Sequence, residues 1–236
     1  MISDETVYKT VDYQKVYSNA NELLVSNHVI EMFPFKANKL LQDQSDIRLC
    51  SYKKALDKYG VNVKTFGSES AVWQEYEGAN IIFYNEREAP YRIRFDIMHE
   101  FGHFRLDHVM NLDADDPLYQ KQELEANCFA AQILMPEQII RECIKRGKNN
   151  SIHFLKSSFD VSEDAAVKRR KTLANTNPEW KSRAEQEYDD IILLRYATFL
   201  DVIAPKYDNK YSSYYYEDEY ALQERRNSWY DERGRW

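Results

Sequence analysis

The chain has 236 residues, 43% of them hydrophobic, which suits one compact domain with an appendage better than two full domains. Its net charge of −7 argues against bulk nucleic-acid binding, because an acidic protein repels the phosphate backbone. No stretch has the roughly 18 consecutive apolar residues of a membrane span, and the three cysteines form no CxxC pair. We therefore expect a cytoplasmic protein with reduced thiols and no membrane partner.

The first part of the chain predicts helices followed by a small sheet. Apolar residues at helical spacing dominate residues 16–60 and predict two or three helices that end at Gly60. Three short segments rich in β-branched and aromatic residues follow, VNVKTF, SAVWQEY and ANIIFYN, and glycines separate them. We expect these three segments to form a small antiparallel sheet.

Two further helices are expected after the sheet. Residues 91–108 carry apolar side chains on nearly every side, which is typical of a helix buried on most faces. Asp116 and Pro117 then provide a cap and a first helical position, and this second helix can run until just before Pro136. Its small residues, such as Ala126, would allow another backbone to approach closely.

The last part of the chain predicts more helices and a polar end. Residues 152–174 read as a helix, a turn and a second helix, and residues 185–203 form a further apolar helix candidate. Beyond residue 206 tyrosines and charged residues dominate, with almost no aliphatic side chain. We expect this segment to be flexible and to add little to the core.

The sequence HEFGH places His99 and His103 four positions apart, with Glu100 beside the first histidine. Residues four apart on a helix share a face, so both imidazoles can reach one zinc ion. Glu100 lies one step round the helix, where it can act as the general base on a water molecule that the metal activates. The alternative is a pair of buried histidines bonded to carbonyl groups.

A catalytic zinc also needs a third protein ligand, and ELEAN in the next helix offers Glu123 and Glu125. The two lie about 200° apart around a helix axis, so only one can face the histidines. Glu123 lies one turn before Asn127, on the face with the small residues, and is the expected ligand. Asn127 should steady a ligand imidazole through its second nitrogen. We expect Glu125 to be solvated or paired with a cation and to matter little for zinc binding.

Three segments, ANIIFYN, RFDIMHEFGHFRLDH and ELEANCFAAQILMP, resemble in sequence and in order the ImmA/IrrE family of zinc metallopeptidases. FDVSEDAAVKRRKTL resembles the helical segment that usually follows the core of that family. The resemblance implies an α+β, zincin-like fold with a small antiparallel sheet, an active-site helix, additional C-terminal helices and a Zn²⁺ cofactor. It also implies cleavage of a repressor-type regulator, often in proteins encoded on mobile elements.

These observations divide the chain into four parts. Residues 1–140 would form the metallopeptidase core, residues 141–178 a helix-turn-helix-like segment and residues 179–206 a C-terminal helix. Residues 207–236 are the tyrosine-rich tail, which departs from the short family pattern.

Three residues near the motif keep more than one interpretation. His108 could be a further ligand or a hydrogen-bond donor to the transition state, but a structural or capping role is favoured, because five residues after His103 it points off the zinc face. Tyr119 is a second candidate for stabilising the oxyanion. Cys128 could tune the site by oxidation, although a core role is the more common one for cysteine.

Three functions follow from these patterns. The first is a zinc-dependent endopeptidase, a hydrolase whose protein substrate lies extended along the edge of the sheet at ANIIFYN. The second is a non-catalytic zinc-containing module that binds or senses a transcription regulator and does not need Glu100. The third is a DNA-binding regulator that uses residues 152–174, which have helix-turn-helix spacing and a KRRK run. We favour the endopeptidase and do not expect nucleic acid as a partner.

Overall fold

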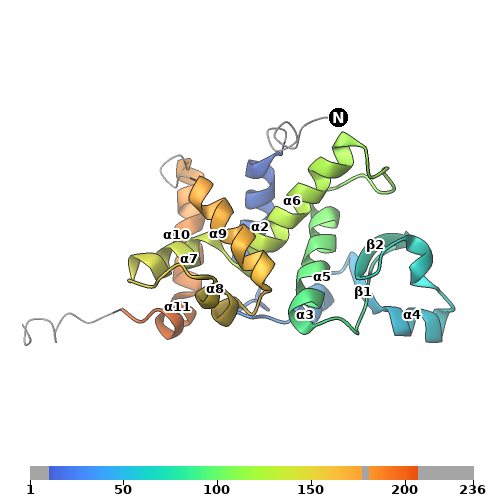
Figure 1. Ribbon diagram of the computed structural model, residues 1–236, viewed down its shortest axis with the longest axis horizontal. Coiled ribbons are helices and arrows are strands. Elements are labelled where there is room, and N and C mark those ends of the chain that lie inside the picture. The colour runs from blue at the N-terminus through green and yellow to red at the C-terminus, as the bar shows by residue number, and fades with distance from the viewer. Residues whose placement is uncertain (1–10, 177–180, 207–236) are drawn as a thin grey trace, which may run out of the picture.

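The computed structural model describes residues 11–176 and 181–206 and has the α+β architecture that the sequence predicts. Figure 1 shows a small sheet at one end of a larger body of helices. The tyrosine-rich tail, residues 207–236, lies outside the described residues. The elements in chain order are α2 (Tyr13–Ser26), α3 (Ala37–Gln42), β1 (Ile47–Ser51), α4 (Tyr52–Tyr59), the 3₁₀ helix η1 (Val63–Phe66), β2 (Ala71–Tyr76), β3 (Ala79–Tyr84), α5 (Pro90–Arg105), α6 (Pro117–Leu134), α7 (Glu137–Lys145), α8 (Ile152–Phe159), α9 (Glu163–Asn175), α10 (Arg183–Arg195) and α11 (Ala197–Ile203).

The sheet has three strands in the order β1-β3-β2, so β3 is the central strand. β2 and β3 form an antiparallel hairpin, and both residues of its tight turn, Glu77 and Gly78, have positive φ values of 52° and 73°. β1 pairs with β3 in the parallel direction. The sheet is therefore mixed, which corrects the expectation of a wholly antiparallel sheet.

One of the three strands lies elsewhere in the sequence than expected. VNVKTF contributes the 3₁₀ helix η1, and the remaining strand is β1, in a region where we expected only helices. Strand formation depends more on a pairing partner than on local propensity. β1 finds that partner in the apolar strand β3, whereas β3 has no further edge for VNVKTF to join.

The position of β3 also changes where a substrate could pair. ANIIFYN supplies β3, which is hydrogen-bonded to a neighbour on each side. A peptide cannot add to a strand whose two edges are both occupied. The expected pairing with ANIIFYN is therefore wrong, and only the outer edges of β1 and β2 remain for it.

α5 and α6 pack against each other, and α5 lies on the side of the helical body next to the sheet (Figure 1). Their backbones come close because Gly102 of α5 faces Ala126 and Phe129 of α6. A Cβ atom on Gly102 would lie only 3.3 Å from Cα of Ala126, so any larger residue would push the two helices slightly apart. Ala126 thus lies on the face of close approach that the sequence predicts.

Buried polar contacts connect α6 to the helices around it. Arg169 of α9, only 2% exposed, donates through Nε to the carbonyl oxygen of Met135 at 3.0 Å and also donates to the side chain of Gln132. Gln132 in turn donates to Oδ1 of Asn21 in α2 at 2.8 Å. These bonds satisfy polar groups that the core would otherwise leave without partners, and they fix α2 and α9 against α6.

The two helices expected around the HExxH motif and ELEAN are present as α5 and α6, and α5 is shorter than expected. α6 begins as predicted, with the side chain of Asp116 accepting a hydrogen bond of 2.8 Å from the backbone N–H of Leu118. α5 ends at Arg105 rather than at residue 108.

The domain boundary expected at residue 140 falls within α7, and the division of the chain stays a prediction. Within residues 11–176 and 181–206 no helix combines the length and the apolar character that crossing a membrane would require.

Candidate metal centre and active site

His99 and His103 lie one turn apart on α5, and their imidazoles meet the carboxylate of Glu123 from α6. The two Nε2 atoms are 3.0 Å apart. Glu123 places Oε2 3.4 Å from Nε2 of His99 and Oε1 3.3 Å from Nε2 of His103. Among the described residues these three form the group of side chains that could hold a metal ion.

The donor set fits a zinc ion. Two ligand atoms of a tetrahedral zinc, each bonded at about 2.0 Å, lie about 3.3 Å apart. The two Nε2 atoms are 3.0 Å apart, and the two oxygens of Glu123 lie 3.4 Å from His99 and 3.3 Å from His103, one oxygen to each histidine. Two imidazole nitrogens and one carboxylate oxygen are also a ligand set that catalytic zinc sites use, with a fourth position left for water.

Asn127 lies behind His99, as its predicted role requires. Its Oδ1 atom is 3.2 Å from Nδ1 of His99, and its amide donates to the carbonyl oxygen of Glu123 at 2.7 Å. The second bond is the i to i−4 contact of residues on one helix face and fixes the orientation of the amide. His99 can then donate from Nδ1 to Asn127 and keep the Nε2 lone pair for a metal.

Glu100 is not part of the group formed by the three ligand candidates, and its carboxylate contacts the sheet. Its Oε2 atom accepts a hydrogen bond of 2.8 Å from the backbone N–H of Trp73 in β2. Sequence reasoning did not identify Trp73, because the contact joins segments 27 residues apart and uses a backbone group. The bond places a carboxylate beside the candidate metal centre and outside the group of three side chains that could hold a metal ion.

The side chains of Glu100 and Glu123 have pKa values that are shifted in opposite directions, because their burial and their neighbours differ. Burial raises the pKa of Glu100, although His99 and His103 partly oppose that rise. Burial acts on Glu123 in the same direction, but hydrogen bonds from His103 and His99 outweigh it and hold the pKa of Glu123 well below its usual range. A raised pKa suits a group that must accept a proton, and a lowered pKa suits a metal ligand.

His108 contacts His103 because of the way α5 ends. Asp107 adopts a left-handed conformation with φ of 56°, and the backbone N–H of His108 returns to the carbonyl oxygen of His103 at 3.1 Å. This is a Schellman ending, which brings together the side chains of these two positions. Nδ1 of His108 lies 2.9 Å from Nδ1 of His103. We expected His108 to point off the zinc face, and it is not part of the group that could hold a metal ion, but this ending brings it against Nδ1 of His103.

Glu125 was expected to be solvated or paired with a cation, and the structure shows it buried and beside a cation rather than solvated. It is 7% exposed, and its Oε2 atom lies 3.1 Å from Nε2 of His108. Nζ of Lys121 lies 3.6 Å from Oε1, so the expected cation is present as well. Glu125 does not reach the group formed by Glu123 and the two ligand histidines, and its contact is with His108 instead.

Two other residues that the sequence singled out lie near the site. Tyr119 lies one turn before Glu123 on α6, and burial together with the carboxylates of Glu123 and Glu100 raises the pKa of its phenol. It stays a candidate for stabilising an oxyanion. Cys128 is partly buried, and burial raises the pKa of its thiol, which makes it a poor nucleophile and favours the core role.

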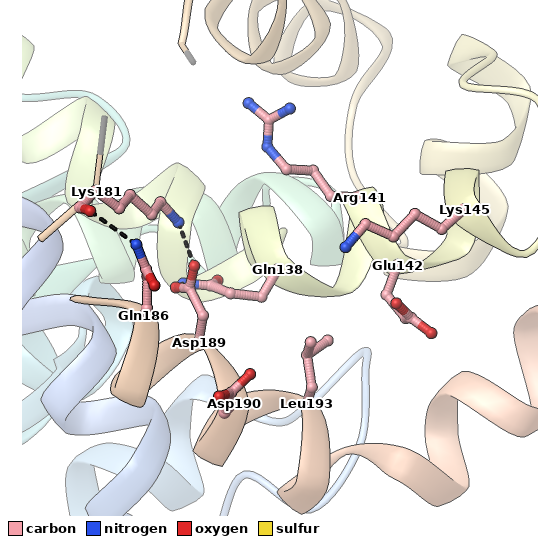
Figure 2. A pocket seen from close by; sticks show the side chains of 9 residues that line it. All are labelled: Gln138, Arg141, Glu142, Lys145, Lys181, Gln186, Asp189, Asp190 and Leu193. Carbon is pink, nitrogen blue, oxygen red and sulfur yellow. Dashed lines mark hydrogen bonds and ion pairs between the residues drawn. The ribbon is translucent and has the colours of Figure 1, made fainter. Parts of the chain in front are cut away.

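A cavity of about 290 Å³ lies between α7 and α10 and contains none of the three ligand candidates (Figure 2). Four of its charged residues, Arg141, Glu142, Lys181 and Asp189, pair with one another or with nearby residues. Nζ of Lys181 lies 2.6 Å from Asp189, and Nε of Arg141 lies 2.8 Å from Glu137. We assign no function to this cavity.

The KRRK run does not form a continuous basic surface. Lys168, Arg170 and Lys171 are exposed, but Arg169 points into the core and bonds to Met135. Three exposed cations on one short helix would neutralise few DNA phosphates and so would bind DNA only weakly. This arrangement removes part of the reason for the DNA-binding hypothesis.

Comparison with known proteins identifies the family. No curated protein matches the chain at a significant level. A family model, described as the IrrE N-terminal-like domain of the peptidase family M78, matches residues 54–171, which is half of the chain and includes α5, α6 and the HExxH motif. The chain therefore belongs to the M78 peptidase family with the IrrE N-terminal-like domain.

Proposed function

We propose that the chain is a zinc-dependent endopeptidase that cleaves a repressor-type regulatory protein. The observation that carries the proposal is the arrangement of four side chains. His99, His103 and Glu123 converge at separations that suit one zinc ion, and Glu100 lies beside them without joining them. A purely structural zinc site would be closed by a fourth protein ligand and would have no use for an adjacent base.

The residues of the chain divide the chemistry among them. Zinc, when bound by His99, His103 and Glu123, would acidify a water molecule and polarise the scissile carbonyl. Glu100 would take the proton of the attacking water and later donate it to the leaving amine. Its raised pKa supports both steps, because the proton must be held briefly and then released.

The substrate would lie along the outer edge of β2. This edge faces α5, as the bond from the backbone N–H of Trp73 to Glu100 indicates. Successive residues of a strand point their backbone groups to alternate sides, so Ala71, Trp73 and Glu75 present theirs to the same edge, where the N–H of Trp73 is already bonded to Glu100 and the carbonyl oxygen of Ala71 to Oγ of Ser68. An extended peptide paired there would pass the centre formed by the histidines and Glu123.

The test is co-expression of the chain with regulators encoded next to its gene. The wild type should produce defined fragments, which mass spectrometry identifies. Glu100→Gln should reduce cleavage by about 10²–10⁴-fold, because the amide cannot accept the proton. Glu163→Gln, which changes an exposed carboxylate on α9, is the control and should cleave like the wild type.

The same experiment separates the rival functions. If wild type and Glu100→Gln bind the regulator equally and neither cleaves it, the chain is a binding module. Cleavage by Glu100→Gln within a few-fold of the wild type would show that Glu100 is not the base. Metal content and circular dichroism of the variant, both expected to match the wild type, establish that the substitution acts on chemistry alone.

A further inference from the structure

A chain of two hydrogen bonds leads away from His103 on the side opposite the metal cluster. Nδ1 of His103 lies 2.9 Å from Nδ1 of His108, and Nε2 of His108 lies 3.1 Å from Oε2 of Glu125. His108 and Glu125 are 8% and 7% exposed, so water does not compete freely for these bonds. We propose that His108 and Glu125 are positioning residues that fix His103 with the Nε2 lone pair directed at the zinc ion. The inference rests on the zinc site of the proposed function.

The chemistry of the carboxylate determines the direction of both bonds. An ionised carboxylate only accepts, so Nε2 of His108 must carry a proton and donate it to Glu125. Nδ1 of a neutral His108 then has a lone pair and accepts, which requires Nδ1 of His103 to carry the proton. His103 is left with a free lone pair on Nε2, the atom that lies 3.3 Å from Glu123 and 3.0 Å from Nε2 of His99. The carboxylate thus selects the metal-binding tautomer of His103 through a second imidazole.

Contacts from the start of α2 and from α6 hold the far end of this chain of hydrogen bonds. Oε1 of Glu125 accepts from the backbone N–H of Asp12, just before α2, at 2.9 Å, and it faces Lys121 of α6 at 3.6 Å. Lys15 of α2 donates to the carbonyl oxygen of Leu106 at 2.6 Å, which secures the turn before His108. Glu125 therefore accepts on both oxygens and has no freedom to rotate away from His108.

The two ligand histidines are held in different ways. His99 is backed by the amide of Asn127, which is exposed and neutral. His103 is backed by a buried chain that ends in a carboxylate. An anionic partner raises the basicity of a ligand imidazole more than a neutral one does. Disturbing Glu125 should therefore weaken zinc binding even though Glu125 never touches the metal.

Glu125→Gln is the decisive substitution, because it keeps the shape of the side chain and changes only its hydrogen bonding. If the amide oxygen faces His108, the amide nitrogen faces the N–H of Asp12, and two donors oppose each other. If the nitrogen faces His108 instead, that histidine must reverse its tautomer and donate from Nδ1 to His103. His103 would then accept at Nδ1 and carry its proton on Nε2, where zinc must bind.

The experiment measures zinc affinity of the full chain, stripped of metal, by competition with a chelator. Glu125→Gln and His108→Leu should each lower the affinity by about 10–100-fold. His108→Asn should lose less than His108→Leu, because its amide oxygen can take over the acceptor position of Nδ1. The visible spectrum of the cobalt-substituted protein should also change in Glu125→Gln, which a loss of stability alone would not cause.

Glu137→Gln is the matched control. Glu137 is a carboxylate at 2% exposure on α7, paired with Arg141 and Lys181 rather than with a histidine. Its substitution should alter thermal stability but leave zinc affinity within about twofold of the wild type, since it has no bond to the ligand residues. Zinc affinity of Glu125→Gln equal to that of Glu137→Gln and of the wild type would overturn the inference while leaving the zinc site intact. A wild type that binds no zinc would overturn both the inference and the proposed function.

Discussion

The backbone N–H of Trp73 donates a hydrogen bond of 2.8 Å to Oε2 of Glu100 and so connects the edge of the sheet to the expected base. Trp73 is held in place by its side chain. Its indole N–H donates to Asn80 at 3.1 Å, and its ring packs edge-on against Phe104 with the centroids 5.7 Å apart. The sheet therefore determines where the carboxylate of Glu100 lies relative to the histidines of α5.

Purified protein should contain about one zinc ion per chain, because three donors converge at separations that suit one ion. Elemental analysis after gel filtration measures this stoichiometry. The double variant His99→Ala, His103→Ala should contain almost none. If the double variant contained as much zinc as the wild type, the HExxH motif would not be the metal site.

Glu123→Ala removes one of the three expected metal ligands. It should therefore weaken zinc binding by more than the roughly 10–100-fold expected when a residue that only positions a ligand is lost. Asn127→Ala should lie within that smaller range, since it removes only the partner of His99. Competition with a chelator ranks the two variants. A larger loss for Asn127→Ala would mean that Glu123 is not a ligand.

Gly102→Ala should destabilise the protein by about 1–3 kcal/mol, because the added methyl group would lie 3.1 Å from Phe129 Cδ1 and 3.3 Å from the backbone of Ala126. α5 carries both ligand histidines and α6 carries Glu123, so separating the helices should weaken zinc binding as well. Denaturant unfolding and chelator competition measure the two effects.

Gly147→Ala is the control for that substitution. Gly147 has a φ of 88° and no atom within 4 Å of an added Cβ, so alanine there strains only the local backbone. Its stability should fall, but its zinc affinity should match that of the wild type. If Gly102→Ala also leaves zinc affinity unchanged, the contact between α5 and α6 does not control the spacing of the ligands.

The triple variant Lys168→Ala, Arg170→Ala, Lys171→Ala should fold normally, since all three side chains are exposed. Arg169→Met should destabilise the protein by about 1–3 kcal/mol, because it removes the donor to the buried carbonyl oxygen of Met135 and one of the two donors to Oε1 of Gln132. Neither the wild type nor the triple variant should be retained on a DNA column in a salt-dependent manner. Strong retention of the wild type, lost in the triple variant, would support DNA binding through α9.

The sequence by itself determined the local parts of the site. HExxH specifies three side chains on one helix, and the geometry of a helix separates Glu123 from Glu125 without any knowledge of the fold. Capping signals located the start of α6 at Pro117, and its small residues identified the face that α5 approaches. These features depend on residues close together in the chain, which is why a sequence pattern can reveal them.

Only the tertiary structure decided the parts that depend on distant segments or on the end of a helix. β1 became a strand because β3 offered an edge, and Trp73 reached Glu100 because the hairpin lies against α5. His108 met His103 because Asp107 adopts a left-handed conformation, which its sequence context does not signal. Glu125 is buried, and the backbone N–H of Asp12 bonds to it from a distant part of the sequence. Pairing and burial depend on which segments fold together, and local propensity does not contain that information.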